Sequence, residues 1–229
     1  MRLPMRVGVF DSGVGGLNVL AQCMRQLPEV QYYYYGDNAN APYGLRQKEE
    51  VVRFVDRAME QFASLHVDAA ILACNTVTAL CARELREKYP FPIIGMEPAV
   101  RPAASVCRDV LVLATPHTVQ SERFRRLVNA FPNCRFTVYA LPRLAGEIER
   151  CLARGTMLTL SDHLPDCSPD GVVLGCTHYI YFRREIARFY ACPVFDGVSG
   201  TVNRLERVLF GRAETEQTGI GDHHCPATN

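Results

Sequence analysis

Residues 69–76 read Ala-Ala-Ile-Leu-Ala-Cys-Asn-Thr, and residues 171–178 read Gly-Val-Val-Leu-Gly-Cys-Thr-His. Each stretch is a short apolar run that ends in a cysteine and two polar residues, with Cys74 in the first and Cys176 in the second. Such a run is typical of a buried strand, and its polar residues stand where the carboxyl end of the strand would be. Ligands of open α/β sheets bind at that end. The two stretches therefore predict similar α/β units that bring two thiols to one substrate.

The rest of the chain repeats this alternation of apolar runs and helical patterns, which is typical of parallel βαβ units. Strands are expected near residues 7–10, 31–35, 110–114, 135–141 and 193–197, and helices over 46–64, 143–153, 179–190 and 199–210. The predicted fold class is α/β, with two similar lobes, each a mostly parallel sheet flanked by helices, and the active site in the cleft between them. The expected lobes are residues 1–97, joined by 196–229, and residues 98–195, with a hinge near 95–100 and a loose tail over 211–229.

Composition excludes several classes of function. The 229 residues are 48% hydrophobic, which is ordinary for a protein that buries a core. With 25 basic and 24 acidic residues the net charge is +1, so the chain has no electrostatic footprint for nucleic acid or for a charged membrane surface. We find no apolar stretch long enough to span a membrane and no signal peptide. A cytoplasmic protein is expected.

The ten cysteines include no CxxC pair, so a zinc ribbon or finger is not expected. A secreted disulfide scaffold is equally unexpected for a long α/β chain without a signal peptide. We expect free thiols in a reducing compartment and no metal.

Polar residues gather at several predicted strand ends. They are Asp11-Ser12-Gly13, Cys74-Asn75-Thr76, residues 115–118 and Cys176-Thr177-His178, and a further loop holds Pro42-Tyr43-Gly44. Where a strand leads into a helix, hydroxyls and free backbone N–H groups favour anions such as carboxylates. Helix capping alone explains any one of these loops. Five of them in one chain favour a binding site.

The two cysteines admit a structural interpretation, because cysteine is among the most buried residue types. Their matched polar surroundings favour catalysis instead, since a helix N-terminus lowers the pKa of a thiol. His178 could polarise Cys176 or carry a proton, and Asp11 could play the matching role beside Cys74. The glycines at 13–16 fit neither a P-loop nor a dinucleotide fingerprint, so close packing at the turn between strand and helix explains them better.

These residues give the chain a resemblance to the glutamate racemases of the aspartate/glutamate racemase superfamily. The matching segments are Gly8–Leu17, Tyr35–Asp37, Pro42–Gly44, Ala73–Thr76 and Gly175–Tyr179, and weaker matches are Glu97-Pro98, Ala114-Thr115 with Thr118 and Ser121, and Glu149. The resemblance extends from about residue 6 to 210.

The resemblance implies a glutamate racemase (EC 5.1.1.3) that needs no cofactor and supplies D-glutamate for peptidoglycan. It implies that Cys74 and Cys176 are the acid/base pair, one removing the α-proton and the other donating a proton to the opposite face. Asp11 and His178 would assist them. The implied substrate-binding residues are Asp11, Ser12, Pro42, Tyr43, Gly44, Asn75, Thr76, Thr118, Thr177 and His178, with Asp37 and Glu149 as helpers. A homodimer is compatible with the resemblance.

Three positions depart from the pattern of that family. Ile180 follows the His-Tyr pair where proline is usual, Leu141 precedes Pro142 where cysteine is usual, and Val77-Thr78 replaces Ala-Ser. These departures remove no catalytic group but bear on substrate fit and rate.

Three other functions are alternatives to the racemisation of glutamate. A pyridoxal-phosphate racemase needs a Schiff-base lysine, and Lys48 and Lys88, the only lysines, stand in no motif. A racemase or isomerase of aspartate or another small acid, and a non-catalytic amino-acid-binding protein, stay open. Paired cysteines favour racemisation, because acid and base must face opposite sides of one carbon.

Overall fold

The computed structural model describes residues 4–211, whose strands form two four-stranded parallel sheets. The first sheet has the order β2-β1-β3-β4, with β1 at Arg6–Asp11, β2 at Gln31–Gly36, β3 at Ala69–Leu72 and β4 at Ile93–Gly95. The second has the order β6-β5-β7-β8, with β5 at Asp109–Ala114, β6 at Arg135–Ala140, β7 at Gly171–Gly175 and β8 at Val194–Asp196. Each sheet with its helices is called a lobe below. The predicted α/β class with two similar lobes is confirmed.

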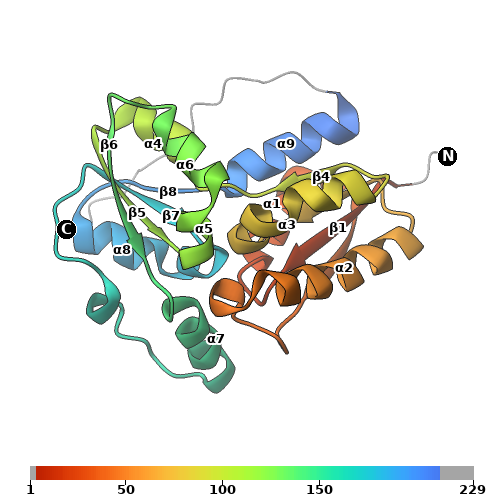
Figure 1. Ribbon diagram of the computed structural model, residues 1–229, viewed down its shortest axis with the longest axis horizontal. Helices are drawn as coiled ribbons and strands as arrows, with labels where there is room; N and C mark the ends of the chain where they lie inside the picture. The colour runs from red at the N-terminus through yellow and green to blue at the C-terminus, as the bar shows by residue number, and fades with distance from the viewer. Residues whose placement is uncertain (1–3, 212–229) are drawn as a thin grey trace, which may run out of the picture.

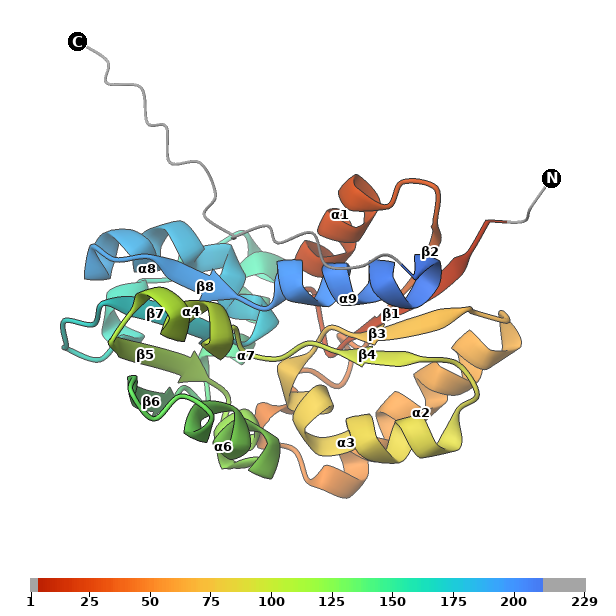
Figure 2. The same ribbon diagram turned by 90° about the horizontal axis from the view of Figure 1, so that it is seen from above.

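Helices cover both faces of the first sheet (Figure 2). Helices α2 (Lys48–Ser64) and α3 (Asn75–Lys88) pack on one face, and α1 (Leu17–Gln26) and α9 (Val198–Phe210) pack on the other. The buried residues of α1 are Val19 and Cys23, whereas Leu17 and Met24 are exposed. Because both faces are covered, β3 is apolar along its length and β1 is apolar between Arg6 and Asp11, as is usual for parallel strands.

The second sheet is covered in the same way. Helices α7 (Leu144–Arg154) and α8 (Arg183–Tyr190) pack on one face, and α4 (Val100–Val106) and α6 (Glu122–Asn129) on the other. Short elements complete the chain: α5 (Pro116–Gln120) and the 3₁₀ helices η1 (Tyr43–Leu45), η2 (Leu160–His163) and η3 (Thr177–Phe182).

One expected helix has different bounds. The segment predicted as a helix over 179–190 begins with the 3₁₀ helix η3, and the α-helix starts only at Arg183. The Tyr179 hydroxyl donates to the carbonyl of Leu141 at 2.9 Å, so this tight first turn is anchored to the segment that follows β6. The early 3₁₀ turn keeps the segment after Cys176 buried.

The chain passes twice between the lobes, from β4 to α4 and from β8 to α9 (Figure 1). The two crossings touch. A Cβ at Gly197 would lie 2.3 Å from the Glu97 carbonyl oxygen and 2.7 Å from Met96 Cγ, so only glycine fits there. The first crossing coincides with the hinge expected near 95–100. The second returns α9 to the first lobe, where it lies beside α1 (Figure 2).

Within residues 4–211 no helix is both long and apolar enough to cross a membrane. The loose tail expected over 211–229 lies, from residue 212 onward, outside the described residues.

Candidate active site

The carboxyl ends of strands from both sheets meet at the junction of the lobes. Strand β1 ends at Asp11, β3 just before Cys74, and β7 just before Cys176. The arrowheads of β1 and β5 point towards this junction (Figure 1). Both thiols line one small cavity there, of about 10 Å³, whose lining is Ser12, Pro42, Tyr43, Gly44, Cys74, Asn75, Thr76, Thr115, Ala145, Cys176 and His178. One cavity therefore receives both predicted acid/base residues.

Cys74 is the N-cap residue of α3 and is buried. The Ser12 hydroxyl donates to its sulfur at 3.5 Å. Burial, followed by the negative charge of Asp11, raises the pKa of Cys74 to about 12, while Ser12 and the Val77 N–H act in the opposite direction. In this arrangement Cys74 is a protonated thiol.

Asp11 is completely buried behind the cavity and joins the two lobes. Its Oδ1 accepts from the Gly13 N–H at 3.0 Å, and its Oδ2 accepts from the Thr177 hydroxyl at 3.1 Å. Burial raises the pKa of Asp11, against the lowering effect of the nearby His178. Asp11 therefore lies beside Cys74, as expected, but also contacts the Cys176 side of the site.

Cys176 has a histidine and a carboxylate as companions. Nδ1 of His178 lies 3.8 Å from the Cys176 sulfur, and Nε2 lies 2.5 Å from Glu149 Oε1. Burial works against the charged imidazole, but the contacts with Cys176 and Glu149 outweigh it and raise the pKa of His178 to about 10. Burial also opposes the charge on Glu149, yet His178 and the Val14 N–H lower the pKa of that carboxyl. His178 is thus an imidazolium that lies beside the Cys176 sulfur.

A chain of hydroxyls crosses from one lobe to the other at the far side of the cavity. Thr76 Oγ1 lies 2.9 Å from Thr115 Oγ1, which lies 3.0 Å from Thr118 Oγ1. Thr115 also caps α5, since its side chain accepts from the Thr118 N–H. Thr115 lines the cavity, whereas the expected Thr118 lies behind it. In the sequence, Thr115 belongs to the polar residues 115–118 that follow β5, and this position indicated that it could lie near a ligand.

The loop that carries Pro42, Tyr43 and Gly44 is held from behind by Asp37. The Tyr43 hydroxyl and the Asn40 amide both donate to the Asp37 carboxylate. Asp37 lies outside the cavity lining and so acts as a support for the loop.

Asn75 is the lining residue with an unsatisfied polar atom. Its Nδ2 donates to the Met96 carbonyl at 3.2 Å, while Oδ1 is buried and has no hydrogen-bond partner among residues 4–211. Buried polar atoms are rarely left unpaired, so Oδ1 is suited to accept from a ligand.

The glycine-rich turn after β1 packs against the second lobe. A Cβ at Gly13 would lie 1.8 Å from Glu149 Oε1, and one at Gly15 would lie 2.4 Å from Thr177 Oγ1. Close packing was the predicted reason for these glycines, but the partner at these two positions is the opposite lobe rather than their own helix.

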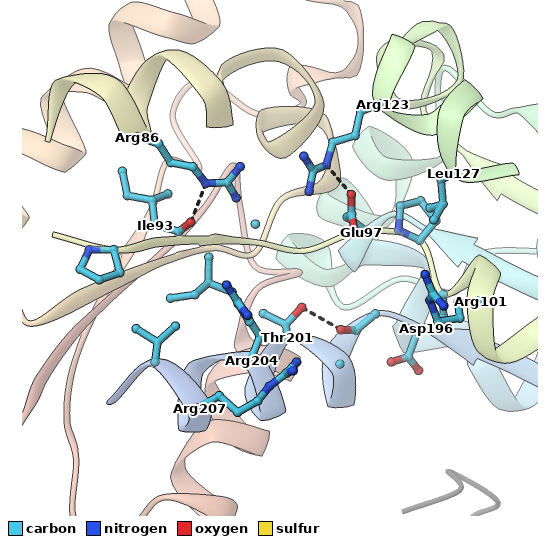
Figure 3. A pocket seen from close by; sticks show the side chains of 18 of the residues that line it. Arg86, Ile93, Glu97, Arg101, Arg123, Leu127, Asp196, Thr201, Arg204 and Arg207 are labelled. Carbon is cyan, nitrogen blue, oxygen red and sulfur yellow. Dashed lines mark hydrogen bonds and ion pairs between the residues drawn. The ribbon is translucent and has the colours of Figure 1, made fainter. Parts of the chain in front are cut away.

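A much larger cavity, of about 1020 Å³, lies around the first crossing between the lobes (Figure 3). Its lining includes Arg86, Arg101, Arg123, Arg204 and Arg207. In Figure 3, Arg86 and Arg123 lie on one side of the crossing chain and Arg204 and Arg207 on the other, and Arg123 pairs with Glu97. Burial, followed by the positive charges of Arg123 and Arg204, lowers the pKa of Arg86, while the negative charge of Glu97 acts in the opposite direction. Neither thiol lines this cavity, so the smaller one is the candidate active site.

Nine of the residues expected in the site line the smaller cavity, and the other five bond to neighbours in the site instead. Asp11, Thr177 and Glu149 belong to the second kind, because each bonds to a neighbour in the site without facing the enclosed space. Thr115 and Ala145 also line the cavity but were not among the expected substrate-binding residues, and only Thr115 belongs to a polar strand end noted in the sequence. Across the described residues no group of three or more His, Cys, Asp or Glu side chains is arranged to hold a metal ion.

Comparisons with known proteins agree on one family. The family described as Asp/Glu/Hydantoin racemase matches residues 11–205. A glutamate racemase of Halothermothrix orenii is 40% identical over 95% of this chain and 90% of its own length, and "Glutamate racemase 2" of Bacillus subtilis is 36% identical over 95% and 85%. The crystal structure of Escherichia coli glutamate racemase with L-glutamate and the activator UDP-MurNAc-ala superposes with a TM-score of 0.82, at 30% identity over 93% of this chain and 85% of that one.

Proposed function

The chain belongs to the Asp/Glu/Hydantoin racemase family, and from that premise we propose that Cys74 and Cys176 are the two opposed proton-transfer groups of its reaction. The activity is that of a glutamate racemase, an isomerase that interconverts L- and D-glutamate. The observation that carries the proposal is the single small cavity that both thiols line, one from each lobe.

Racemisation inverts one carbon, so the proton must leave one face and arrive at the other. One side chain cannot serve both faces without a large movement. Thiols on opposite lobes meet this requirement with the substrate α-carbon between them. General acid–base catalysis of this kind contributes about 10²–10⁴-fold.

The surroundings of the thiols assign them different roles. Cys176, beside the His178 imidazolium, removes the α-proton of one enantiomer. Cys74, whose pKa is raised by burial and Asp11, is the thiol that donates a proton to the opposite face. The reverse direction exchanges these roles, and bound substrate ammonium next to Asp11 would offset the charge that holds the proton on Cys74.

The N-terminus of α3 is suited to the α-carboxylate. Cys74 is its N-cap residue, and Asn75 and Thr76 of its first turn line the cavity, so N–H groups without a partner inside the helix are available there. These N–H groups stabilise negative charge that develops on the carboxylate as the α-proton leaves. Asn75 Oδ1, together with Asp11, is suited to accept from the α-ammonium.

The hydroxyl chain of Thr76, Thr115 and Thr118 is suited to the side-chain carboxylate of glutamate. Its three oxygens lie within 3.0 Å of their neighbours, beside the loop that carries Tyr43 and Gly44. Hydrogen bonds from hydroxyls to a carboxylate are stronger than those between neutral groups. Aspartate is one methylene shorter than glutamate, and we expect this chain to bind its side-chain carboxylate less well.

We further propose that the reaction needs no cofactor, that it takes place in the cytoplasm, and that its D-glutamate supplies peptidoglycan synthesis. The proposed lobe boundaries are 1–97, joined by 196–229, and 98–195, of which 1–3 and 212–229 lie outside the described residues. A homodimer is the proposed assembly.

The test is the circular dichroism of glutamate and aspartate incubated with the purified chain. We expect the signals of L- and of D-glutamate to decay to zero, and that of aspartate to persist. Loss of the aspartate signal alone would indicate a relative that acts on aspartate. Calorimetric binding of glutamate without any decay would indicate a non-catalytic binding protein.

A further inference from the structure

The cavity between the thiols is far smaller than glutamate. Its volume of about 10 Å³ is roughly that needed for one water molecule. Since residues of both lobes line it, the lobes must move apart for an amino acid to enter and come together again around it. The contacts that join the lobes at the rim therefore help to set the affinity for substrate.

These contacts fall on two flanks of the cavity. On the Cys176 flank, Thr177 donates to Asp11, the Val14 N–H donates to Glu149, and the Tyr181 hydroxyl donates to the Val14 carbonyl. Two of these three involve groups that touch Cys176, His178 or their direct neighbours. A change on this flank would alter the proton chemistry and lobe closure together.

The opposite flank holds a contact that is separate from the reacting groups. Nε2 of His117, in α5 of the second lobe, lies 2.8 Å from the carbonyl oxygen of Arg46 in the first lobe. His117 is half-buried, does not line the cavity, and contacts neither thiol. It stands between Thr115 and Thr118 in the sequence, whose hydroxyls join Thr76 of the first lobe.

The acceptor of this bond belongs to a rigid loop. Arg46 follows η1 directly, its N–H donates to the Tyr43 carbonyl at 3.1 Å, and its Nε donates to the Asn40 carbonyl at 2.6 Å. Asp37 holds Asn40 and the Tyr43 hydroxyl in turn. A hydrogen bond to the Arg46 carbonyl therefore restrains the position of the whole loop that carries Tyr43 and Gly44 at the cavity.

We propose that His117 is a positioning residue that closes the second lobe onto the Pro42–Gly44 loop and thereby raises the affinity for glutamate. The inference rests on the proposed function and adds to it a residue outside the reacting groups. If the bond is lost, the closed form becomes a smaller fraction of the protein, and the apparent affinity falls by that fraction. The closed complex, once formed, keeps its thiols unchanged, so its turnover is preserved.

The bond needs a donor at Nε2 and no particular charge. A neutral imidazole with its proton on Nε2 donates to the carbonyl, and so does an imidazolium. His117 therefore acts across the working pH range, and replacing it leaves the pH profile of kcat unchanged. A group that moved protons in the reaction would change that profile.

The test compares His117→Leu, which has no donor, with His117→Gln, whose amide N–H can take the place of Nε2–H. His163→Leu is the matched control, because His163 is a half-exposed histidine of the same lobe that bonds to Glu147 rather than to the first lobe. We expect His117→Leu to raise the KM for glutamate about fivefold, as befits one lost hydrogen bond, with kcat within about twofold of the parent chain. The KM of His117→Gln should stay close to that of the parent chain.

Three results would overturn the proposal: an unchanged KM in His117→Leu, a collapse of kcat with KM unchanged, or equal impairment of the leucine and glutamine variants. Thermal unfolding of each variant checks that it is folded, and His117→Asn, a shorter donor, replaces His117→Leu if the latter does not fold. Calorimetric binding of D-glutamate to the parent chain and to His117→Leu separates this proposal from the catalytic one. An inactive parent chain that binds D-glutamate more tightly than His117→Leu would contradict the racemase and support the role of His117.

Discussion

The Cys74 and Cys176 halves of the site occupy equivalent places in two equivalent sheets, yet their chemical surroundings differ. Each cysteine follows the strand that lies third in its sheet, β3 or β7, and each caps the helical segment that begins there. Cys74 has a hydroxyl and a buried carboxylate beside it. Cys176 has an imidazolium backed by a second carboxylate.

The residues that form the two similar sheets are therefore separate from the residues that determine the chemistry at each thiol. The sheets bring two sulfurs to opposite sides of one cavity, and this follows from topology alone. Neighbours from other segments then give each sulfur different electrostatic surroundings. The lobes are alike, whereas the surroundings of the two thiols are not.

Substitution of either cysteine of the pair should have the largest effect on activity. We expect Cys74→Ala and Cys176→Ala each to lower racemisation by at least about 10²–10⁴-fold, the usual contribution of a positioned acid or base. With one thiol left, a variant can still remove and return a proton on one face. Nuclear magnetic resonance in D₂O should then show α-deuterium exchange in one enantiomer only, and the opposite enantiomer in the other variant.

Cys81→Ala is the control for these two variants, since Cys81 is a buried cysteine of α3 that does not line the cavity. It should keep its activity. Full racemisation by either Cys74→Ala or Cys176→Ala would end the two-thiol account.

Asp11→Asn alters the Cys74 half while keeping an oxygen that can accept from Thr177. Because the negative charge of Asp11 raises the pKa of Cys74, its removal should bring that pKa below about 12. The pH dependence of Cys74 alkylation by iodoacetamide measures this shift. Activity should fall by about 10- to 100-fold, equivalent to roughly 1.4–2.7 kcal/mol of transition-state stabilisation. An alkylation profile that moves to higher pH would contradict the electrostatic role given to Asp11.

Glu149→Gln alters the Cys176 half, and here the expected effect is smaller. The contacts with Cys176 and Glu149 hold the pKa of His178 at about 10, above its ordinary value of 6.5. The glutamine should lower this pKa, which nuclear magnetic resonance of the imidazole measures, and the alkaline limb of the rate profile should move to lower pH.

The same pair predicts how the free energy of unfolding depends on pH. A folded-state pKa above the unfolded value stabilises the protein fully below pH 6.5, and the stabilisation is lost as pH rises through about 10. One proton corresponds to a slope of at most about 1.4 kcal/mol per pH unit in this window. Urea unfolding at several pH values should show the decline in the parent chain and a shallower one in Glu149→Gln. An equal slope in both proteins would contradict the claim that Glu149 raises the pKa of His178.

Much of the fold was predictable because it depends on local patterns. The apolar runs before Cys74 and Cys176 identify β3 and β7, and their polar ends identify the edge where a ligand binds. The same reasoning did not reveal α4, because its seven residues are too short for a helical period to show. It also missed the 3₁₀ turn of η3, which depends on the contact between Tyr179 and Leu141.

The site was predictable residue by residue but not pair by pair. Sequence patterns indicated Asp11, His178 and the threonines, since each follows a strand. They did not indicate that Thr177 bonds to Asp11 or that the Gly13 turn packs on Glu149, because these contacts depend on how the lobes sit against each other. Asp37, expected as a helper, bonds to Tyr43 of the lining, and Thr118 joins the lining through its bond to Thr115.

The central claim is that two different groups, on opposite faces, remove and return the α-proton. The most direct test is to follow racemisation of one glutamate enantiomer in D₂O at low conversion and to measure deuterium in the substrate and product separately. The account predicts one α-deuterium in the product enantiomer and none in the remaining substrate. In D₂O the donating thiol carries a deuteron from solvent, and it delivers that deuteron to the product only. Deuterium entering the remaining substrate as fast as product forms would show one base acting on both faces, and would contradict the opposed pair of Cys74 and Cys176.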